Sequence, residues 1–552
     1  MHSLKELFAQ NIATGLKQKS LLTCSRWSCA NRIMGQPFPG PWSFKYHPWL
    51  REIHDTDAEM IIAQKAAQVG LTETALNKTF YKIGSQRIDC LYVLPAKQPD
   101  ATDFSSSRFD VALELSPSLS NLFSDVKNVG HKRAGTANLY VRGSRSRAAL
   151  KSIPVGFIVF DEVDEMDQDN IPLAMERASG QRSRQVMMLS TPTIDNHGIN
   201  AYFKDSTQEH FFFKCPACSR HVEMTFPESI VITAESPTDP RIKESHYICK
   251  ECKNTLHHQD KWRFLESGIW VPQYKDREAR GFQITQMYSS ALAGDPKDFA
   301  TAYLNSLNDP ADEQEFFNSK LAKTHIPDGA QIDDIQINDV MGSHIKGPLK
   351  DVKLVTMGID VGRWLHVEID EWILGSQQNT KDVNAAAFCR VINQTKVETF
   401  EQLVTLMKEY KVLYAVIDAH PERRKALDFA MTFPGHVSLC FYPRGISGKN
   451  INISPDNSAE PTVSVDRTSW LDLSLGRFRT KRISLPRNTD LEYKTHIKSL
   501  VRISEKDDDG NVIGRYIKNG EDHYAHARNY AEIALPLALA MGYTSSITQS
   551  VL

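Results

Sequence analysis

The amino-acid sequence predicts an α/β protein with two principal domains and a small metal-stabilised insertion between them. A chain of 552 residues is too long for one hydrophobic core and corresponds to about three or four units of ordinary domain size. Short apolar segments that end in small or polar residues recur along it, which is typical of strands in a mostly parallel sheet. Four of its nine cysteines stand as two CxxC pairs, a pattern that indicates bound metal.

The first α/β domain is expected over residues 46–205, after an N-terminal arm formed by residues 1–45. The arm is predicted because GQPFPGPWSF (35–44) is too rich in proline and glycine for long regular structure. Within the domain, buried strands are predicted at MIIAQKA, DCLYVLPA, GFIVFDEV and QVMMLSTP, and amphipathic or polar stretches separate them. This alternation predicts an open, mostly parallel sheet covered by helices.

Residues 206–282 are expected to form an inserted module, because short aromatic-rich strands surround the cysteine pairs there. Residues 283–350 are expected to form a helical connector, whose helices break at Asp-Pro, and then a polar linker. A second α/β domain is expected over residues 351–552. It should begin with a pair of strands, continue with a helix at 401–410 and a strand at 412–420, and end with a helix from about residue 523.

Composition excludes several classes of protein. The chain is 41% hydrophobic and 24% charged, with a formal net charge of −2, as in a soluble globular protein. No run approaches the ~18–20 apolar residues of a membrane span, so we expect an intracellular protein without a disulfide framework. Contacts to DNA would need local basic clusters, and a solvated face explains each candidate equally well; the candidates are HKR (131–133), RGSRSR (142–147) and RFRTKR (477–482).

The segment QKAAQVGLTE (64–73) lies between a predicted strand and a predicted helix, where phosphate-binding loops occur. In the usual loop, backbone N–H groups at a helix N-terminus hold phosphates, a lysine contacts them and the next Ser/Thr hydroxyl binds Mg²⁺. Here Leu71 precedes Thr72, but Lys65 stands at the strand end, five residues before Gly70. A lysine there can reach the same phosphates from the opposite side of the loop. A strand-turn-helix without a ligand is the alternative interpretation.

Two further strand ends carry polar residues suited to nucleotide hydrolysis. GFIVFDEVDEM (156–166) places Asp161 where it would coordinate Mg²⁺ and Glu162 where it would orient or deprotonate water. An acidic turn without a catalytic role is the alternative. MMLSTPT (187–193) places Ser190 and Thr191 where helicase-like ATPases carry hydroxyl residues that sense the γ-phosphate. Three motifs in this order predict an ATPase domain.

The two CxxC pairs predict a structural zinc site. FKCPAC (213–218) and YICKEC (247–252) supply four thiolates, and zinc prefers four of them in a closed tetrahedral site. A redox CxxC would be single and part of a βαβ unit, so it explains the pattern less well. The predicted ligands are Cys215, Cys218, Cys249 and Cys252. The simplest role is to stabilise an insertion whose core is too small, and a grip on DNA or on a partner is the alternative.

The displaced-lysine loop, FIVFDEVDEM, LSTPT, the cysteine module and a later acid-bearing domain together resemble the large terminase subunit of tailed bacteriophages, in the lambda-like family. The resemblance covers about residues 30–540. It implies a P-loop ATPase domain of the ASCE type with an inserted zinc ribbon, followed by a ribonuclease H-like nuclease domain. It also implies an ATP-driven motor that moves double-stranded DNA into a procapsid, and an endonuclease that cuts concatemeric DNA.

For the ATPase, the resemblance implies a deviant Walker A loop in which Lys65 and Thr72 are the working residues. It implies Asp161 as the ligand of Mg-ATP, Glu162 as the catalytic carboxylate and Ser190-Thr191 as the coupling motif. Nucleotide contacts are expected from the whole loop, namely Gln64, Lys65, Gly70, Leu71, Thr72 and Glu73. An arginine finger offered in trans is expected, with Arg108, Arg142, Arg145 and Arg177 as candidates. Aromatic residues in PWSFKYHPWL (41–50) resemble the segment that cradles adenine, and core packing explains them equally well.

For the nuclease, the resemblance implies carboxylates that converge on two Mg²⁺ or Mn²⁺ ions. Asp360 in GIDVG and Asp418 in YAVIDAH stand on predicted strands, and Asp522 is the expected third acid, at the start of the final helix. The family often carries an acid where this chain has His526, so Glu521, His523 and His526 remain alternatives, since imidazole can bind Mn²⁺. Basic residues near these acids are candidates for DNA phosphates, namely Arg363, Arg423, Arg424 and the run at 477–482.

The resemblance also implies partners and a location. The expected partners are double-stranded DNA, a small terminase subunit, a portal protein on the procapsid and further copies of the chain in a ring. The expected location is the host cell cytoplasm, with transient attachment to the procapsid and absence from the mature virion. Two alternatives stay open: a helicase-like DNA-remodelling ATPase whose C-terminal domain does not cleave, and a zinc-stabilised adaptor with degenerate nucleotide sites.

Overall fold

The computed structural model divides the chain into two compact units, the first ending at His325 and the second beginning at Ile326. It describes residues 22–123, 126–151, 153–181, 184–348, 354–374, 383–443, 446, 448–454, 460–506 and 512–541. The first 21 residues of the predicted arm therefore lie outside the described residues. The second unit begins before residue 351, because Ile332, Ile337 and Val340 in and around helix α14 (Asp334–Asp339) pack into its core.

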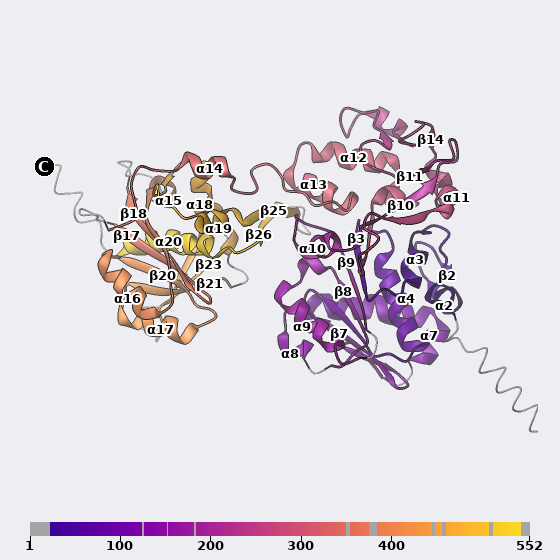
Figure 1. The fold of residues 1–552 in the computed structure, drawn as a ribbon, viewed down its shortest axis with the longest axis horizontal. Helices are drawn as coiled ribbons and strands as arrows, with labels where there is room; N and C mark the ends of the chain where they lie inside the picture. The colour runs from indigo at the N-terminus through magenta and orange to yellow at the C-terminus, as the bar shows by residue number, and fades with distance from the viewer. Residues whose placement is uncertain are drawn as a thin grey trace, which may run out of the picture. The chain divides into compact units, whose positions relative to one another are not determined.

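Unit 1 is built on one large sheet (Figure 1). Seven neighbouring strands run parallel in the order β10-β16-β3-β9-β8-β4-β7, and antiparallel strands extend both ends. All four predicted strands are present. The parallel strands are β3 (Met60–Lys65), β4 (Cys90–Leu94), β7 (Ala137–Gly143), β8 (Phe157–Asp161), β9 (Gln185–Ser190), β10 (Glu209–Lys214) and β16 (Arg280–Ile284), and the antiparallel ones are β5 (Val126–Asn128), β6 (His131–Ala134), β11 (His221–Val222) and β15 (Ile269–Pro272).

Strand β9 lies between β3, which precedes the candidate phosphate loop, and β8, which carries the acidic pair. An additional strand in this position is what the ASCE prediction requires, and the fold class is confirmed. Because these strands are parallel, their carboxyl ends meet at one edge of the sheet, where ligands of open α/β sheets bind. The fold therefore brings together motifs that are far apart in the sequence.

Helices cover both faces of the unit 1 sheet (Figure 1). Successive strand residues alternate between two cores: Ile61 and Ala63 pack with helix α4, while Ile62 packs on the opposite face with α9 and α10. Burial on both faces explains why the strands read as continuous apolar runs. One face carries α2 (Cys24–Asn31), α3 (Leu50–Asp55), α4 (Leu71–Gly84) and α7 (Pro117–Leu122), and the other α8 (Arg147–Leu150), α9 (Ile171–Met175) and α10 (Gly198–Lys204).

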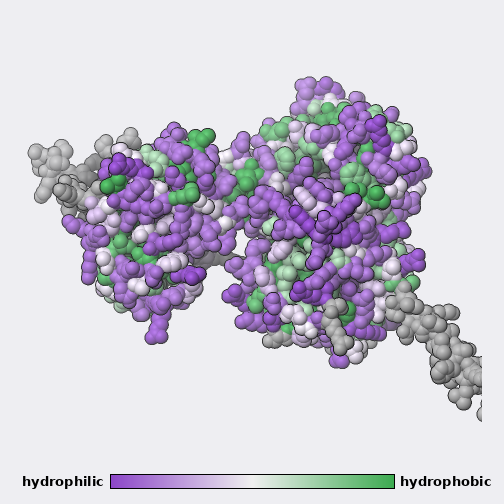
Figure 2. Space-filling model, in the orientation of Figure 1, coloured by the Kyte–Doolittle hydropathy of each residue, from purple (hydrophilic) through white to green (hydrophobic). Residues whose placement is uncertain are grey.

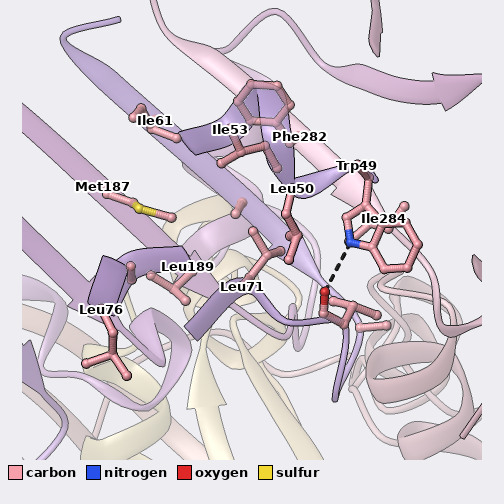
Figure 3. Packing of buried hydrophobic residues seen from close by; sticks show 14 of the residues in the cluster. Trp49, Leu50, Ile53, Ile61, Leu71, Leu76, Met187, Leu189, Phe282 and Ile284 are labelled. Atoms are coloured by element: carbon pink, nitrogen blue, oxygen red, sulfur yellow. Dashed lines mark hydrogen bonds between the residues drawn. The ribbon is translucent and has the colours of Figure 1, made fainter. Parts of the chain in front are cut away.

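The last part of the predicted arm and the aromatic segment after it belong to the core of unit 1. Trp42, Phe44 and Trp49 are buried there, which favours the core-packing interpretation of these three residues. Trp49 lies beside Leu50 and Ile284, and its Nε1 donates a hydrogen bond to the carbonyl of Val69, at 3.0 Å (Figure 3). This bond fixes one side of the loop that follows β3. The hairpin of β1 (Ile33–Met34) and β2 (Gly40–Pro41) precedes this segment.

The cysteine module adds a separate small sheet to unit 1, with the order β12-β13-β14. Its strands are β12 (Ile230–Val231), β13 (His246–Ile248) and β14 (Thr255–Leu256). The predicted break of the connector at Asp-Pro is observed, because the Asp309 side chain caps helix α13 (Pro310–Glu315), directly after α12 (Pro296–Ser306). Strand β16 lies inside the main sheet, so the chain returns from the module to the edge of β3.

Unit 2 contains an eight-stranded sheet with the order β22-β23-β21-β20-β17-β18-β19-β24. The first three strands form an antiparallel meander, and β20 and β21 follow in parallel on the other side of β17. This is the predicted ribonuclease H-like arrangement. The strands are β17 (Val355–Val361), β18 (Leu365–Ile373), β19 (Phe388–Val397), β20 (Tyr414–Asp418), β21 (Val437–Phe441), β22 (Ile451–Ile453), β23 (Thr462–Val465) and β24 (Ile483–Ser484), and a hairpin of β25 (Leu500–Lys506) and β26 (Val512–Lys518) stands apart.

Helices also cover both faces of the unit 2 sheet. Helices α16 (Phe400–Glu409) and α17 (Arg423–Thr432) share one core, and α18 (Arg467–Arg479), α19 (Leu491–Lys498) and α20 (His523–Ala540) share the other. Helix α20 packs so closely on β17 that a Cβ on Gly358 would lie 2.0 Å from the Ala527 carbonyl. Asp360 lies two residues further along β17, on the face toward α20.

Buried ionic groups fix the docking of α20 on the sheet. Arg528 is fully buried and donates to Glu368 and Asp370 on β18 and to Glu532 one turn further along α20. Glu532 also accepts two hydrogen bonds from Arg477, at 2.6 and 2.7 Å. Arg477 was predicted as a contact for DNA phosphates, and this burial makes that prediction wrong for it. Lys132 of the run at 131–133 is likewise buried, 2.7 Å from Asp110.

Hydrophilic residues cover most of the face drawn in Figure 2, and hydrophobic residues appear as small separate areas. The most exposed large hydrophobic residues, Leu292, Leu491 and Ile335, lie far apart in the sequence, and such single residues are normal on a protein surface. Of the helices in the described residues, none is long and apolar enough to span a membrane.

Candidate functional site

The loop between β3 and α4 has the backbone expected of a phosphate-binding loop. Gly70 directly precedes α4 and has a left-handed conformation, with φ of 86°. A Cβ there would lie 2.8 Å from the Leu50 side chain, so glycine is required for both reasons. Four bonds hold the loop from outside: Ala66 N–H donates to Ile284, Ala67 N–H donates to Ser319, and the carbonyls of Ala67 and Val69 accept from Gln286 and Trp49. The loop is therefore preorganised at the N-terminus of a 14-residue helix.

Lys65 lies at the end of β3 and points toward the acidic pair on β8. Its Nζ donates to Glu162 Oε1 at 3.0 Å, and the lysine is 6% exposed. Burial alone lowers the pKa of this ammonium, but Glu162 and Asp161 offset that effect and the net shift of the pKa is upward. The structure thus places the displaced lysine beside the predicted catalytic carboxylate, from which a substrate phosphate could attract it.

Asp161 lies close enough to Thr72 for the two side chains to interact, as expected of two residues that bind one Mg²⁺ ion. Tyr92 donates to Asp161 Oδ2 at 2.6 Å, and the nearby Lys65, Tyr92 and Thr72 side chains lower the pKa of Asp161. Burial, followed by repulsion from Glu162, outweighs this and raises the pKa of Asp161 to about 6. Asp161 Oδ1 is buried and has no hydrogen-bond partner. A buried carboxylate oxygen without a hydrogen-bond partner fits a hard cation.

Glu162 follows the buried strand in an unusual backbone conformation. Its φ is 63°, in the left-handed region that side chains other than glycine seldom adopt. The side chain is 41% exposed and borders an open pocket of about 530 Å³ that Arg145 also lines. Of the other arginine-finger candidates, Arg108 lies 3.6 Å from Glu73 and Arg142 donates to two backbone carbonyls. Arg145 is therefore the candidate that shares a pocket with Glu162.

Three of the predicted nucleotide-binding residues contact other parts of the protein. Leu71 is 1% exposed in the hydrophobic core. Gln64 is buried between the Ala322 carbonyl and the Asn200 amide. Glu73 lies 2.7 Å from the buried Arg32. These contacts shape the loop and the start of α4, so Lys65, Gly70 and Thr72 remain the candidates for direct contact with phosphate.

Asp164 is a residue that the motifs did not single out, although it is the third acid of DEVDEM. It is buried after β8 and accepts hydrogen bonds from Thr193 N–H, Thr193 Oγ1 and Ile199 N–H at 2.8, 2.9 and 2.8 Å. Its own N–H donates to Ser190 Oγ. Burial raises the pKa of Asp164 to about 7. Asp164 thus ties the acidic turn to Ser190 and to the segment after it.

Replacement of Asp164 with asparagine is expected to destabilise unit 1. An amide NH₂ would face an N–H donor that the carboxylate now satisfies, and the expected loss is about 1.5–3 kcal/mol of unfolding free energy. Calorimetry of the full-length chain would show the lower melting temperature. Asp169→Asn, at an exposed position of the same segment, is the matched control and should melt as the wild type does. Equal melting of both variants would contradict a structural role for Asp164.

The four predicted zinc ligands converge in unit 1. Their sulfur atoms all lie within 4.8 Å of one another, and all four cysteines are free. Each pair sits in the same turn: Ser219 N–H donates to Cys215 and Lys253 N–H donates to Cys249, with φ of 60° and 61° at Ser219 and Lys253. Two matching turns that present four thiols to one point fit a structural Zn²⁺ ion.

Removal of one zinc ligand is expected to empty this site and to loosen the module. Cys249→Ser should lose about one equivalent of bound zinc relative to the wild type, as measured by atomic emission on purified protein. The melting temperature should fall too, because the ion replaces a core that this small sheet lacks. Cys29→Ser, at an exposed cysteine outside the module, should retain both zinc and stability. Full zinc content in Cys249→Ser would mean that the ion is bound elsewhere.

In unit 2, the structure brings two of the predicted acids to one edge of the sheet. Asp360 and Asp418 stand near the carboxyl ends of the parallel neighbours β17 and β20, where Ile359 pairs with Ile417. Burial and the Asp360 charge raise the pKa of Asp418 to about 6, although the His420 N–H bond and the nearby His526 and His420 side chains lower it. Neighbouring carboxylates whose charges repel each other are a common arrangement for binding divalent cations.

The third predicted acid, Asp522, has a different partner. Its Oδ2 lies 3.3 Å from His526 Nε2, and this partner holds the pKa of Asp522 at about 2 despite burial. His523 reaches Asp360 instead, with Nδ1 2.8 Å from Oδ2. Among the described residues, Asp360, His366 and His523 form a group whose ligand atoms all lie within 4.8 Å of one another, and neither Asp418 nor Asp522 belongs to it.

His366 was missed by the sequence analysis. It lies on β18 directly opposite Asp360 in the β17–β18 hairpin. The available signal was the spacing in GIDVGRWLHVE, where a tight turn returns the chain beside the first acid. Of the predicted DNA contacts nearby, Arg423 forms an ion pair with Glu460, and Arg363 lines an open pocket with Glu398 and Lys425.

Comparison with models of protein families finds a match to a phage terminase family. Residues 36–270 match the model of the ATPase domain of the phage terminase large subunit gpA. A search of curated proteins finds no match. Among solved structures, the large terminase of bacteriophage HK97 is 12% identical over 93% of this chain and 99% of its own, with a TM-score of 0.46.

Separate domains of the large terminase of Thermus phage P74-26 are also similar. Its ATPase domain is 12% identical over 50% of this chain and 92% of its own, with a TM-score of 0.31. Its nuclease domain is 13% identical over 36% of this chain and 91% of its own, with a TM-score of 0.22. The match over residues 36–270 confirms the predicted resemblance: this part of the chain is similar to the ATPase domain of the phage terminase large subunit.

Proposed function

We propose that this protein is the motor and the nuclease of viral DNA packaging. It would hydrolyse ATP to move double-stranded DNA into a procapsid, and it would cut concatemeric DNA with Mg²⁺ or Mn²⁺. The observation that carries the proposal is the convergence of Lys65, Thr72, Asp161 and Glu162 at one sheet edge of unit 1, in a domain of the terminase family.

In the ATPase site, Mg-ATP would supply the phosphoryl group, and Thr72 and Asp161 would hold the cation. The loop amides and the N-terminus of α4 would bind the phosphates. A phosphate that attracts the Lys65 ammonium would release Glu162 from the ion pair now present at 3.0 Å. Glu162 could then orient or deprotonate the attacking water. The same ion pair would keep hydrolysis low when no nucleotide is bound.

In unit 2, Asp360 and Asp418 would hold divalent metal, which supplies an activated water and stabilises the leaving oxygen. Arg363, Arg423 and Arg424 would contact DNA phosphates. A second candidate function, a DNA-remodelling ATPase whose second domain does not cleave, has one observation in its favour. Asp522, the expected third acid, is paired with His526 and does not belong to the group formed by Asp360, His366 and His523.

The partners would be double-stranded DNA, a small terminase subunit, a portal protein on the procapsid and further copies of this chain in a ring. The work would take place in the host cell cytoplasm, on procapsids and not in the mature virion. We propose that unit 1 holds the motor together with the zinc ribbon around its four cysteines, and that unit 2 holds the nuclease. The trans-acting arginine of the ring would be one of Arg108, Arg142, Arg145 and Arg177.

The decisive experiment measures two activities on one preparation of full-length, zinc-loaded protein. Supercoiled plasmid is incubated with Mg²⁺ or Mn²⁺ to detect nicking and linearisation, and phosphate release from ATP is followed with and without DNA. We expect both activities. ATP turnover without cleavage would favour the remodelling ATPase, and the lack of both in a folded protein would favour an adaptor with degenerate sites.

A further inference from the structure

Three side chains from three elements of unit 2 meet beside the proposed nuclease acids. Asp360 comes from β17, His366 from β18 and His523 from the first turn of α20. Their ligand atoms all lie within 4.8 Å of one another. The rings of His366 and His523 are stacked, with centroids 4.5 Å apart and planes 7° from parallel. Because imidazole binds a metal ion in the plane of its ring, a cation shared by all three residues would require one of the two stacked rings to turn out of the stack.

His366 provides an independent sign of a ligand. The residue is 4% exposed, and its Nδ1 is buried without a hydrogen-bond partner. An unpaired buried nitrogen of this kind is destabilising, and native proteins rarely leave such a group without a partner. Coordination by the imidazoles of this cluster would offset that cost.

We infer that Asp360, His366 and His523 form a binding site for a transition-metal dication such as Mn²⁺, Co²⁺ or Zn²⁺. The ligand set decides the class of metal. Two imidazoles and one carboxylate suit first-row transition metals, whereas Mg²⁺ demands oxygen ligands. The site differs from the predicted set of Asp360, Asp418 and Asp522, and it shares with that set the single residue Asp360.

Neighbouring groups hold Asp360, His366 and His523 in positions from which they could bind a metal ion. The β17–β18 hairpin places Asp360 and His366 opposite each other, so their separation is fixed by backbone pairing. His523 Nε2 lies 2.8 Å from Glu521 Oε2, and a carboxylate on the outer nitrogen is the usual way to orient a metal-binding imidazole. The cation would then replace the present bond between His523 Nδ1 and Asp360. His496, with its ring centroid 5.8 Å from that of His523, adds a further imidazole near the site.

A role for this ion in DNA cleavage rests on the proposed nuclease function. The binding of the ion to Asp360, His366 and His523 does not. Binding of Mn²⁺ to full-length, zinc-loaded protein without nucleotide can be followed by electron paramagnetic resonance, with Mg²⁺ as competitor. Mn²⁺ should bind with about tenfold or greater preference over Mg²⁺. His366→Asn and His523→Asn should each weaken Mn²⁺ binding by about tenfold or more.

His436→Asn is the control, because His436 precedes β21 and lies toward the opposite end of the sheet, where Val437 pairs with Ala415. It should bind Mn²⁺ as the wild type does. His523 is partly exposed, so its variant tests the site even if His366→Asn fails to fold. Wild-type Mn²⁺ affinity in a folded His523→Asn variant, or equal affinity for Mg²⁺ and Mn²⁺, would overturn the inference.

The plasmid assay separates this inference from the proposed function. Specific Mn²⁺ binding without any DNA cleavage would sustain the metal site and refute the nuclease. Cleavage that proceeds with Mg²⁺ at the wild-type rate in both histidine variants, together with wild-type Mn²⁺ binding, would sustain the nuclease and refute the metal site.

Discussion

Replacement of Glu162 with glutamine is expected to slow ATP hydrolysis by about 10²–10⁴-fold, the usual contribution of a positioned general base. Glutamine keeps the size of the side chain but cannot take a proton from water. It also removes the partner of the Lys65 ammonium, now 3.0 Å away. A lysine freed from this pair is available to phosphate, so nucleotide affinity should be unchanged or higher. The loss should therefore appear in kcat rather than in binding.

The measurement is the rate of phosphate release at saturating ATP and DNA, beside the affinity for a fluorescent nucleotide. Glu165→Gln is the matched control, because Glu165 lines the same open pocket three residues further along and carries no proposed role in hydrolysis. It should retain most of the wild-type rate. DNA cleavage should be unaffected in both variants. If Glu162→Gln hydrolyses ATP at the wild-type rate, another group must activate the water.

The parts of the ATPase site that lie at strand ends could be predicted from the sequence. Continuous apolar runs mark strands buried on both faces, and parallel strands bring their carboxyl ends together. This is why Lys65, Asp161 and Ser190 lie at the ends of neighbouring strands. What the pattern lacks is the partner of each polar group. The pairing of Asp164 with Thr193 and Ile199, and of Glu73 with Arg32, depends on tertiary contacts that no local spacing encodes.

The third metal ligand predicted for unit 2 also depends on tertiary contacts that the sequence pattern does not show. Residues 521–526 offer four polar candidates within two turns at the start of one helix, and only the rotation of that helix decides which of them meets Asp360. The rotation is set far along α20, where buried Arg528 pairs with Glu368 and Asp370. Such a network is visible in the sequence only as ordinary charged residues. The structure consequently selects His523, a choice that composition and spacing left open.

Charge runs were the least reliable guide. The segment at 477–482 reads as a basic surface patch, yet Arg477 is 3% exposed and donates to Glu532. An arginine on the core face of α18 can be buried because Glu532 on α20 neutralises it and nearby carbonyls accept its remaining N–H groups. A single sequence does not distinguish this case from a solvated face.

Replacement of Asp360 with asparagine is expected to lower metal-dependent DNA cleavage by about a hundredfold or more, while ATP hydrolysis is retained. Asp360 belongs both to the pair with Asp418 and to the cluster with His366 and His523. Its strand is the parallel neighbour of the one that carries Asp418, and its Oδ2 lies 2.8 Å from His523. Asparagine keeps the shape but has no negative charge, so any cation bound there would lose its strongest ligand.

Linearisation of plasmid with Mg²⁺ and with Mn²⁺ measures the effect, on protein whose melting temperature matches that of the wild type. Asp428→Asn, at an exposed position on α17, is the control and should cleave normally. Asp418→Asn should resemble Asp360→Asn if both acids hold metal. Retention of Mn²⁺-supported cleavage in Asp360→Asn would place the chemistry away from this sheet edge, and loss of ATP hydrolysis in the same folded variant would show that the two activities are not carried by separate sites.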